Sequence, residues 1–120
     1  MATHLQLGQF GEQEAKRYLE AQAYQILATN WRYKHWEVDI IAKDANILVF
    51  VEVKIRTSTA FGEPFSFVDE RKQRNLIKAA EAYLRINGHE GDIRFDIVSI
   101  HVQNNKEANV QLIKDAFWSN

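Results

Sequence analysis

Two neighbouring segments decide the fold of this chain: Phe50-Val51-Glu52-Val53-Lys54-Ile55-Arg56 and, before it, Glu37-Val38-Asp39-Ile40-Ile41-Ala42. In both, β-branched residues alternate with charged ones, as in a strand whose side chains point to opposite faces in turn. Glu52 and Lys54 therefore share one face, and the carboxylates of the earlier segment alternate in the same way. If the two segments form a hairpin, carboxylates from both strands can meet beside an amine, which is the chemistry of a metal-dependent phosphodiesterase.

The loop between the two segments sets their register. Asp44-Ala45-Asn46 contains residue types that suit a tight hairpin turn. If the last two of these residues form the loop, Asp39 lies opposite Glu52, and Glu37 lies opposite Lys54 on the same face. A three-residue loop would shift the pairing by one residue. The two ligand candidates would then point to opposite faces unless a bulge intervened.

The same alternation also describes an ordinary half-exposed strand that is apolar on one side and charged on the other. The run Ile47-Leu48-Val49-Phe50-Val51 argues for more, because it is apolar on both faces. Such a run is typical of an interior strand that is covered on each side. Charges that emerge from an interior strand are expected to lie in a cleft, and both interpretations stay open at this level.

Length and composition predict one globular domain over residues 1–120. A chain of 120 residues is long enough to bury about two-thirds of its unfolded surface, and its 46% hydrophobic and 26% charged residues are ordinary values. The chain has no cysteine, so disulfides and thiolate metal sites are excluded. The N-terminus lacks the layout of a signal peptide, and the apolar runs are too short to span a bilayer. We therefore expect a cytoplasmic protein that does not enter a membrane.

The formal net charge of -1 argues against a protein that binds DNA through its overall charge. Basic residues nevertheless outnumber acidic ones between positions 54 and 78. The basic residues there are Lys54, Arg56, Arg71, Lys72, Arg74 and Lys78, and the acidic ones are Glu63, Asp69 and Glu70. This local excess could follow a phosphate backbone, although a charged helix is also simply a solvated face.

The pattern of periodicity and turn residues predicts the element order αβββαββ. Helices are expected at residues 3–23 and 70–87, with Asp69 as the N-cap and Gly88 as the stop of the second. Strands are expected at residues 24–32, 37–43, 47–56, 93–102 and 110–113, with a polar turn at 104–106. A loop at 57–67 holds three phenylalanines, which could stack on nucleobases or fill the core beneath the loop.

The first helix sets Gly8, Glu12, Ala15 and Leu19 on one stripe. The small residues Gly8 and Ala15 would let this helix approach a sheet closely and carry the carboxylate of Glu12 toward it. Alternatively, Glu12 lies solvated at the edge of the stripe.

The second helix has Lys72 at the start of an apolar stripe, and Arg74 on its wetter side. The side chain of Lys72 either extends to solvent or reaches over the carboxylates of the two strands.

Several motifs in fixed order carry a resemblance over most of the chain. They are Gly8-x-x-Gly11-Glu12-x-x-Ala15-x-x-Tyr18-Leu19, Asn30-x-Arg32, Glu37-x-Asp39-x-Ile41-Ala42, Phe50-Val51-Glu52-Val53-Lys54-x-Arg56, Gly62-x-Pro64, Lys72 and Arg94-Phe95-Asp96. The arrangement resembles the restriction-endonuclease-like nuclease superfamily. Within it, the chain resembles the YraN family of uncharacterised bacterial proteins, which looks like a relative of archaeal Holliday-junction resolvases.

The resemblance implies an α/β fold, a mixed sheet flanked by helices, with Asp39 and Glu52 as metal ligands. It places Lys54 beside the attacked phosphate and makes Glu12 an accessory ligand or water-holder. Glu37 is a further accessory candidate. Two positions depart from the pattern: no proline precedes Asp39, and Trp36 stands where members of the family usually have a glycine.

The sequence thus leads to the expectation of a Mg2+-dependent nuclease that acts on DNA, including branched DNA. Magnesium, with Mn2+ as the alternative, suits the hard oxygen ligands of two carboxylates. Arg56, Lys72 and Arg74 are the candidates for binding DNA, and cleavage of a symmetric junction would require a homodimer. Two other functions stay open, namely a non-catalytic nucleic-acid-binding module and a protein-interaction domain.

Overall fold

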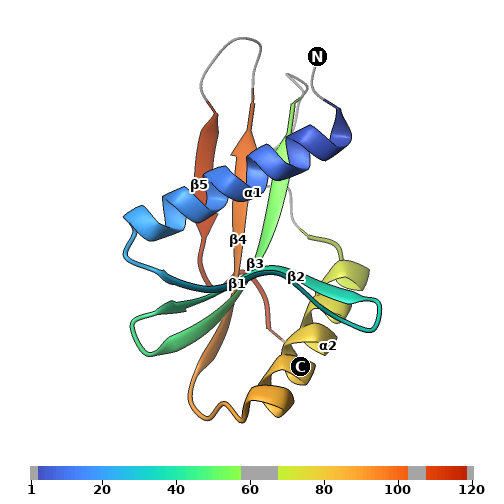
Figure 1. Ribbon diagram of the computed structural model, residues 1–120, viewed down its shortest axis with the longest axis vertical. Helices are drawn as coiled ribbons and strands as arrows, with labels where there is room; N and C mark the ends of the chain where they lie inside the picture. The colour runs from blue at the N-terminus through green and yellow to red at the C-terminus, as the bar shows by residue number, and fades with distance from the viewer. Residues whose placement is uncertain (1–2, 58–67, 103–107, 119–120) are drawn as a thin grey trace.

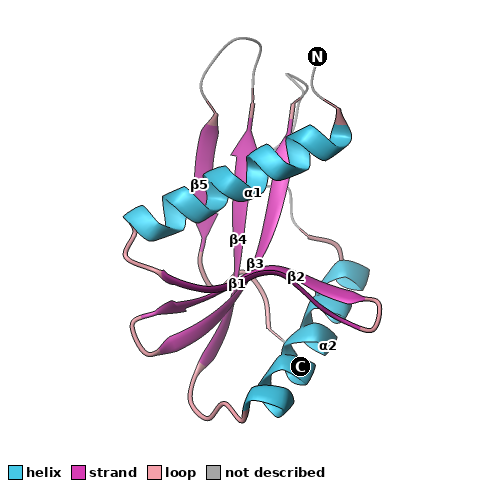
Figure 2. Cartoon of the chain, viewed as in Figure 1, coloured by secondary structure: helices cyan, strands magenta, loops and turns pink. Residues whose placement is uncertain are grey.

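The computed structural model of the chain describes residues 3–57, 68–102 and 108–118. Within them, two helices and five strands follow one another in the predicted order αβββαββ (Figures 1 and 2). The elements are α1 (His4–Ala21), β1 (Gln25–Tyr33), β2 (Trp36–Asp44), β3 (Ile47–Arg56), α2 (Glu70–Asn87), β4 (Ile93–His101) and β5 (Asn109–Ile113). The three loop phenylalanines and the turn at 104–106 lie outside the described residues.

The five strands form one mixed sheet in the order β1-β2-β3-β4-β5. Neighbouring strands are antiparallel except β3 and β4, which are parallel because the chain crosses over through α2 between them. One core cluster joins Ala15 and Leu19 of α1 to one face, and another joins Leu76 and Ala79 of α2 to the other. The predicted mixed sheet flanked by helices is therefore confirmed, and β3 lies at its centre.

The turn between β2 and β3 has the predicted two-residue loop. Asp44 pairs with Ile47, and the ladder continues to the pair of Ile40 and Val51. Ala45 takes a φ of 55° at the first turn position, as one common type of two-residue hairpin turn requires. The register that brings the carboxylates of β2 and β3 to the same end of the ladder is confirmed.

The close approach of α1 to the sheet occurs at Gly11 and not at Gly8. A Cβ atom on Gly11 would lie 3.2 Å from Cδ1 of Ile55, whereas one on Gly8 would have nothing within 4 Å. The prediction for Gly8 is wrong because α1 crosses β3 one turn further along the helix. Ala15 and Leu19 are buried as predicted.

Helix α2 begins and ends as its sequence predicts. Asp69 accepts a hydrogen bond from the backbone N–H of Lys72 at 2.8 Å, and Gly88 ends the helix with a φ of 60°. Among the described residues, neither helix is both long and apolar enough to cross a bilayer.

Candidate functional site

The carboxylates of Asp39 and Glu52 meet where the ladder between β2 and β3 ends. Asp39 precedes Ile40 and Glu52 follows Val51, so both lie one position beyond the last pair of the ladder, Ile40 and Val51. The backbone N–H of Val53 donates a hydrogen bond to Oδ2 of Asp39 at 2.8 Å, and the Asp39 carboxyl group is also a hydrogen-bond partner of Glu52. The two residues predicted to share an ion are thus neighbours through their side chains.

This carboxylate pair, Asp39 and Glu52, is largely shielded from water. Glu52 is only 4% exposed. Burial and the negative charge of Glu52 raise the pKa of Asp39 to about 8, while the hydrogen bond from Val53 acts in the opposite direction. Near neutral pH the pair therefore retains a proton in the absence of a cation.

One lysine contacts the carboxylate pair, and a second follows Glu52 on the same face of β3. The Nζ atom of Lys72, in the first turn of α2, is 3.3 Å from Oε2 of Glu52, and this charge raises the pKa of Lys72. Lys72 therefore reaches over the carboxylates, which was one of the two interpretations of its place in the sequence. Lys54, half-buried, is the next residue after Glu52 on the same side of β3.

Glu12 of α1 contacts Asn30 of β1 and not the carboxylate pair itself. The side chain of Asn30 donates a hydrogen bond to Oε2 of Glu12 at 2.8 Å. Asn30 lies beside Asp39 in the β1–β2 ladder, because the residues on either side of it pair with those on either side of Asp39. No group of three or more metal-binding side chains occurs within the described ranges, so the structure brings together two carboxylates and not three.

Glu37 contacts β1 instead of β3. Its Oε2 atom is 3.1 Å from Nε of Arg32, its Cα partner across the β1–β2 ladder. The predicted pair of Glu37 and Lys54 lies beyond the end of the β2–β3 ladder, so it is replaced by this contact. Glu37 still acts on the site through its charge, which helps to raise the pKa of Asp39.

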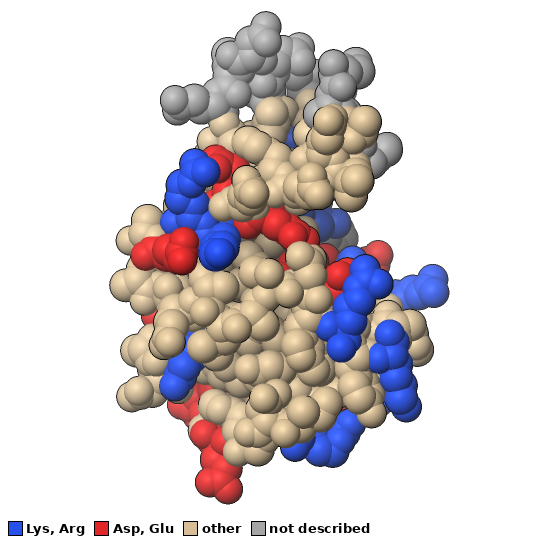
Figure 3. Space-filling model, in the orientation of Figure 1, with Lys and Arg blue, Asp and Glu red and all other residues tan. Residues whose placement is uncertain are grey.

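The three candidate DNA-binding residues have different surroundings. Lys72 is engaged with Glu52, whereas Arg74 is 67% exposed and forms a long 3.9 Å contact with Glu70. Arg56 is half-buried at the end of β3. Figure 3 shows basic side chains gathered on the flank formed by α2 and the β1–β2 hairpin.

The donor set of the pair fits a hard divalent cation. Mg2+ is commonly bound through one or two carboxylates and keeps several water molecules. Asp39 and Glu52 offer such oxygens, and a cation would relieve the repulsion from Glu52 that helps to raise the pKa of Asp39. They are the described residues that could hold Mg2+ or Mn2+.

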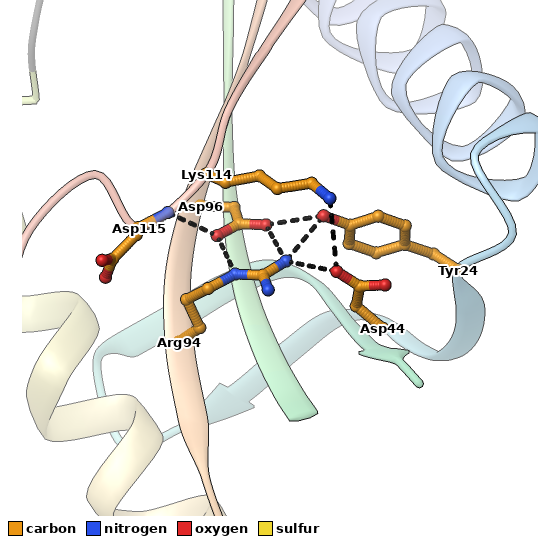
Figure 4. A network of polar contacts seen from close by, with 6 residues as sticks. All are labelled: Tyr24, Asp44, Arg94, Asp96, Lys114 and Asp115. Carbon is orange, nitrogen blue, oxygen red and sulfur yellow. Dashed lines mark hydrogen bonds and ion pairs between the residues drawn. The ribbon is translucent and has the colours of Figure 1, made fainter. Parts of the chain in front are cut away.

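A second polar network lies at the other end of β2 and centres on the fully buried Asp96 (Figure 4). Arg94 donates to both of its oxygens, from Nε at 2.8 Å and from Nη2 at 2.9 Å, and the hydroxyl of Tyr24 donates at 2.9 Å. Asp44, Lys114 and the backbone of Asp115 complete the network. The network joins Tyr24, which precedes β1, to β2, β4 and the segment after β5, so we interpret it as structural.

Comparison with known proteins gives the same family along nearly the whole chain. The family model described as uncharacterised protein family UPF0102 matches residues 11–100. A UPF0102 protein from Chlorobium chlorochromatii is 46% identical over 118 residues, covering 94% of this chain and 92% of its own. One from Flavobacterium johnsoniae is 48% identical over 122 residues, covering 98% of both chains. The chain therefore belongs to the uncharacterised protein family UPF0102, the YraN family.

Proposed function

We propose that this protein is a Mg2+-dependent nuclease with a restriction-endonuclease-like fold that hydrolyses phosphodiester bonds in DNA, including branched DNA. The observation that supports it most is the meeting of Asp39 and Glu52 at the end of the β2–β3 ladder, with Lys54 next on the same strand. Two oxygen ligands and an amine from a rigid sheet are the groups that metal-assisted phosphodiester hydrolysis needs.

Each group has a role that follows from its surroundings. A divalent cation, when bound, supplies an acidified water molecule and positive charge at the attacked phosphate. Asp39 is oriented by the N–H of Val53, and Glu52 by the ammonium of Lys72, so neither carboxylate has to be ordered on binding. Lys54 orients the attacking water and offsets the negative charge that develops on the phosphate.

DNA would approach along the flank that carries the basic residues. Arg74 is exposed and Arg56 closes β3, so both can contact phosphates beside the carboxylate pair. Because the whole chain has a formal charge of -1, affinity depends on this local patch and falls steeply with salt. Neutralising one contacting residue lowers the slope of log affinity against log salt by about one.

One contact favours a second candidate, a non-catalytic nucleic-acid-binding module. The ammonium of Lys72 already provides a cation to Glu52 at 3.3 Å. If that ion pair replaced the metal ion, the same surface would bind DNA without cutting it.

The deciding experiment is a cleavage screen with Mg2+ or Mn2+ on duplex, single-stranded, flapped and four-way DNA. Cleavage is expected for the wild type and lost in Glu52→Gln and Lys54→Ala, with circular dichroism showing that both remain folded. Lys16→Ala, an exposed position on α1, is the control that keeps activity.

Two results would contradict the proposal. Inactivity on every substrate with retained DNA binding would favour the binding module. Absence of DNA binding even at low salt would leave a protein-interaction domain as the remaining function.

A further inference from the structure

Three aromatic rings form a continuous strip on the β1–β2 hairpin. Trp31 and Tyr33 have ring centroids 6.4 Å apart with an interplanar angle of 9°, and Tyr33 and Trp36 are 6.3 Å apart at 20°. Tyr33 and Trp36 are also Cα partners across the two strands, on either side of the turn at Lys34 and His35. The three nearly parallel rings, Trp31, Tyr33 and Trp36, are called the aromatic strip below.

The aromatic strip is attached to the core at one end and open at the other. The Trp31 ring packs edge-on against Tyr83 of α2, with centroids 5.3 Å apart at 81°. All three rings of the strip are half-buried, so each keeps part of its surface in solvent. The contact with α2 fixes the orientation of Trp31, on which the other two rings stack, and this lowers the entropic cost of binding a planar ligand.

The ammonium of Lys34 lies over the aromatic strip, and further basic residues are interleaved with it. The residues interleaved with it, Arg32, Lys34 and His35, are all exposed, and no acidic residue occurs between Trp31 and Trp36. Nζ of Lys34 lies 5.6 Å from the centroid of Tyr33 and 6.0 Å from that of Trp36. Aromatic faces bordered by cations complement the bases and phosphates of a nucleic-acid strand.

The aromatic strip also shares strand β2 with Asp39 of the carboxylate pair. Trp36 precedes Asp39 by three residues on β2, which is about 10 Å along a strand. Between them, Glu37 contacts Arg32 of β1 at 3.1 Å. Because three residues separate them, Trp36 and Asp39 point to opposite faces of β2, so a strand whose base lies on Trp36 would reach the carboxylate pair by passing around the end of the hairpin.

We propose that the aromatic strip stacks unpaired bases of single-stranded DNA and thereby directs the nuclease to flaps, forks and other sites with exposed bases. The inference deepens the proposed function and rests on it for the consequence in cleavage. A base takes the face of Trp36 or Tyr33, and the ammonium of Lys34 moves from the rings to the adjacent phosphate. Bases inside a continuous duplex are already stacked on each other and cannot use these rings.

Binding can be measured separately from cleavage, by fluorescence anisotropy of labelled DNA with EDTA present. Trp36→Ala and Tyr33→Ala are expected to weaken binding of single-stranded DNA by roughly five- to a hundred-fold, the equivalent of about 1–3 kcal/mol per stacked base. Duplex binding should stay within about twofold. Trp36→Phe, which keeps a ring, should retain most of the affinity.

The control is Phe10→Ala, which removes an exposed ring from α1 and should leave single-stranded binding unchanged. If Trp36→Ala does not fold, Tyr33→Ala carries the same comparison. Single-stranded RNA bound as tightly as DNA would support stacking but overturn the assignment to DNA.

The inference is overturned if folded variants bind single-stranded DNA as the wild type does, or if they lose duplex and single-stranded binding equally. If the variants lose single-stranded binding but the wild type cuts no substrate, the aromatic strip stands and the nuclease proposal fails. If the wild type cuts flaps and Trp36→Ala cuts them equally well, the nuclease proposal stands and the role of the aromatic strip in directing cleavage fails.

Discussion

The backbone N–H of Val53 donates a 2.8 Å hydrogen bond to Oδ2 of Asp39. A side chain of β2 thus takes a backbone donor of β3 just beyond the last pair of their ladder. The hydrogen bond fixes the carboxylate toward Glu52 while burial and repulsion act against its charge. An asparagine at this position could accept the same hydrogen bond without the charge, which makes it the natural probe of the site.

The first prediction concerns the pH dependence of stability in the metal-free protein. The raised pKa means that folded Asp39 keeps its proton between pH about 4 and about 8, whereas the unfolded chain has lost it. This contribution is fully present below that range and declines as pH rises through it, by up to about 1.4 kcal/mol per pH unit. Urea unfolding with EDTA should show the decline in the wild type and not in Asp39→Asn. Parallel pH profiles for the two proteins would show that Asp39 titrates normally.

The second prediction concerns the ion pair of Lys72 and Glu52. Lys72→Met keeps the apolar stem but leaves a carboxylate that is 4% exposed without its cation, which should cost about 1–3 kcal/mol. Added Mg2+ should then stabilise the variant more than the wild type, since the carboxylate pair has lost the neighbouring ammonium that competes with a metal ion. Thermal unfolding with and without Mg2+ measures both effects, with Lys78→Met as the control from the exposed side of α2. An equal Mg2+ response in all three proteins would refute the coupling.

The third prediction separates two glycines of α1. Gly11→Val should destabilise the fold by about 1–3 kcal/mol, because even the Cβ atom of a new side chain would lie 3.2 Å from Cδ1 of Ile55. Gly8→Ala should stabilise it by up to about 1 kcal/mol through helix propensity, since nothing lies within 4 Å. Urea unfolding of the two variants tests where α1 crosses the sheet. The opposite order of stability would mean that α1 approaches the sheet at Gly8 and not at Gly11.

The fourth prediction concerns the buried network. Asp96→Ala removes the partner of Arg94 and Tyr24 inside the fold and should cost about 3–5 kcal/mol. Asp115→Asn should change the stability by less than about 0.5 kcal/mol, because Asp115 joins the network through its backbone N–H. Chemical unfolding of both variants provides the comparison, and a small loss for Asp96→Ala would mean that the network contributes little.

Local patterns were enough to predict much of the fold. The bounds of β3, the two-residue turn before it and both caps of α2 depend on residues next to one another in the chain. The same register brought Asp39 to Glu52. It could not show where the ladder ends, because sheet twist and packing decide how far two strands stay paired.

Contacts between segments far apart in the chain could not be predicted from the sequence. The crossing of α1 at Gly11 and the contact of Glu37 with Arg32 depend on how elements pack, and no local pattern reports this. The residues Tyr24, Asp44 and Lys114 come from three separate segments, so only the motif Arg94-Phe95-Asp96 of their network was visible.

The central claim is that Asp39 and Glu52 form one divalent-cation site. Isothermal titration calorimetry of Mg2+ in buffers of different ionisation enthalpy tests it most directly, since binding must displace the proton that the pair retains. The expected result for the wild type near pH 7 is one ion per chain with release of a proton. Asp39→Asn should release no proton, and Glu52→Gln should bind much more weakly. Equal binding of Mg2+ by the wild type and both variants, or no binding at millimolar concentrations, would contradict the account.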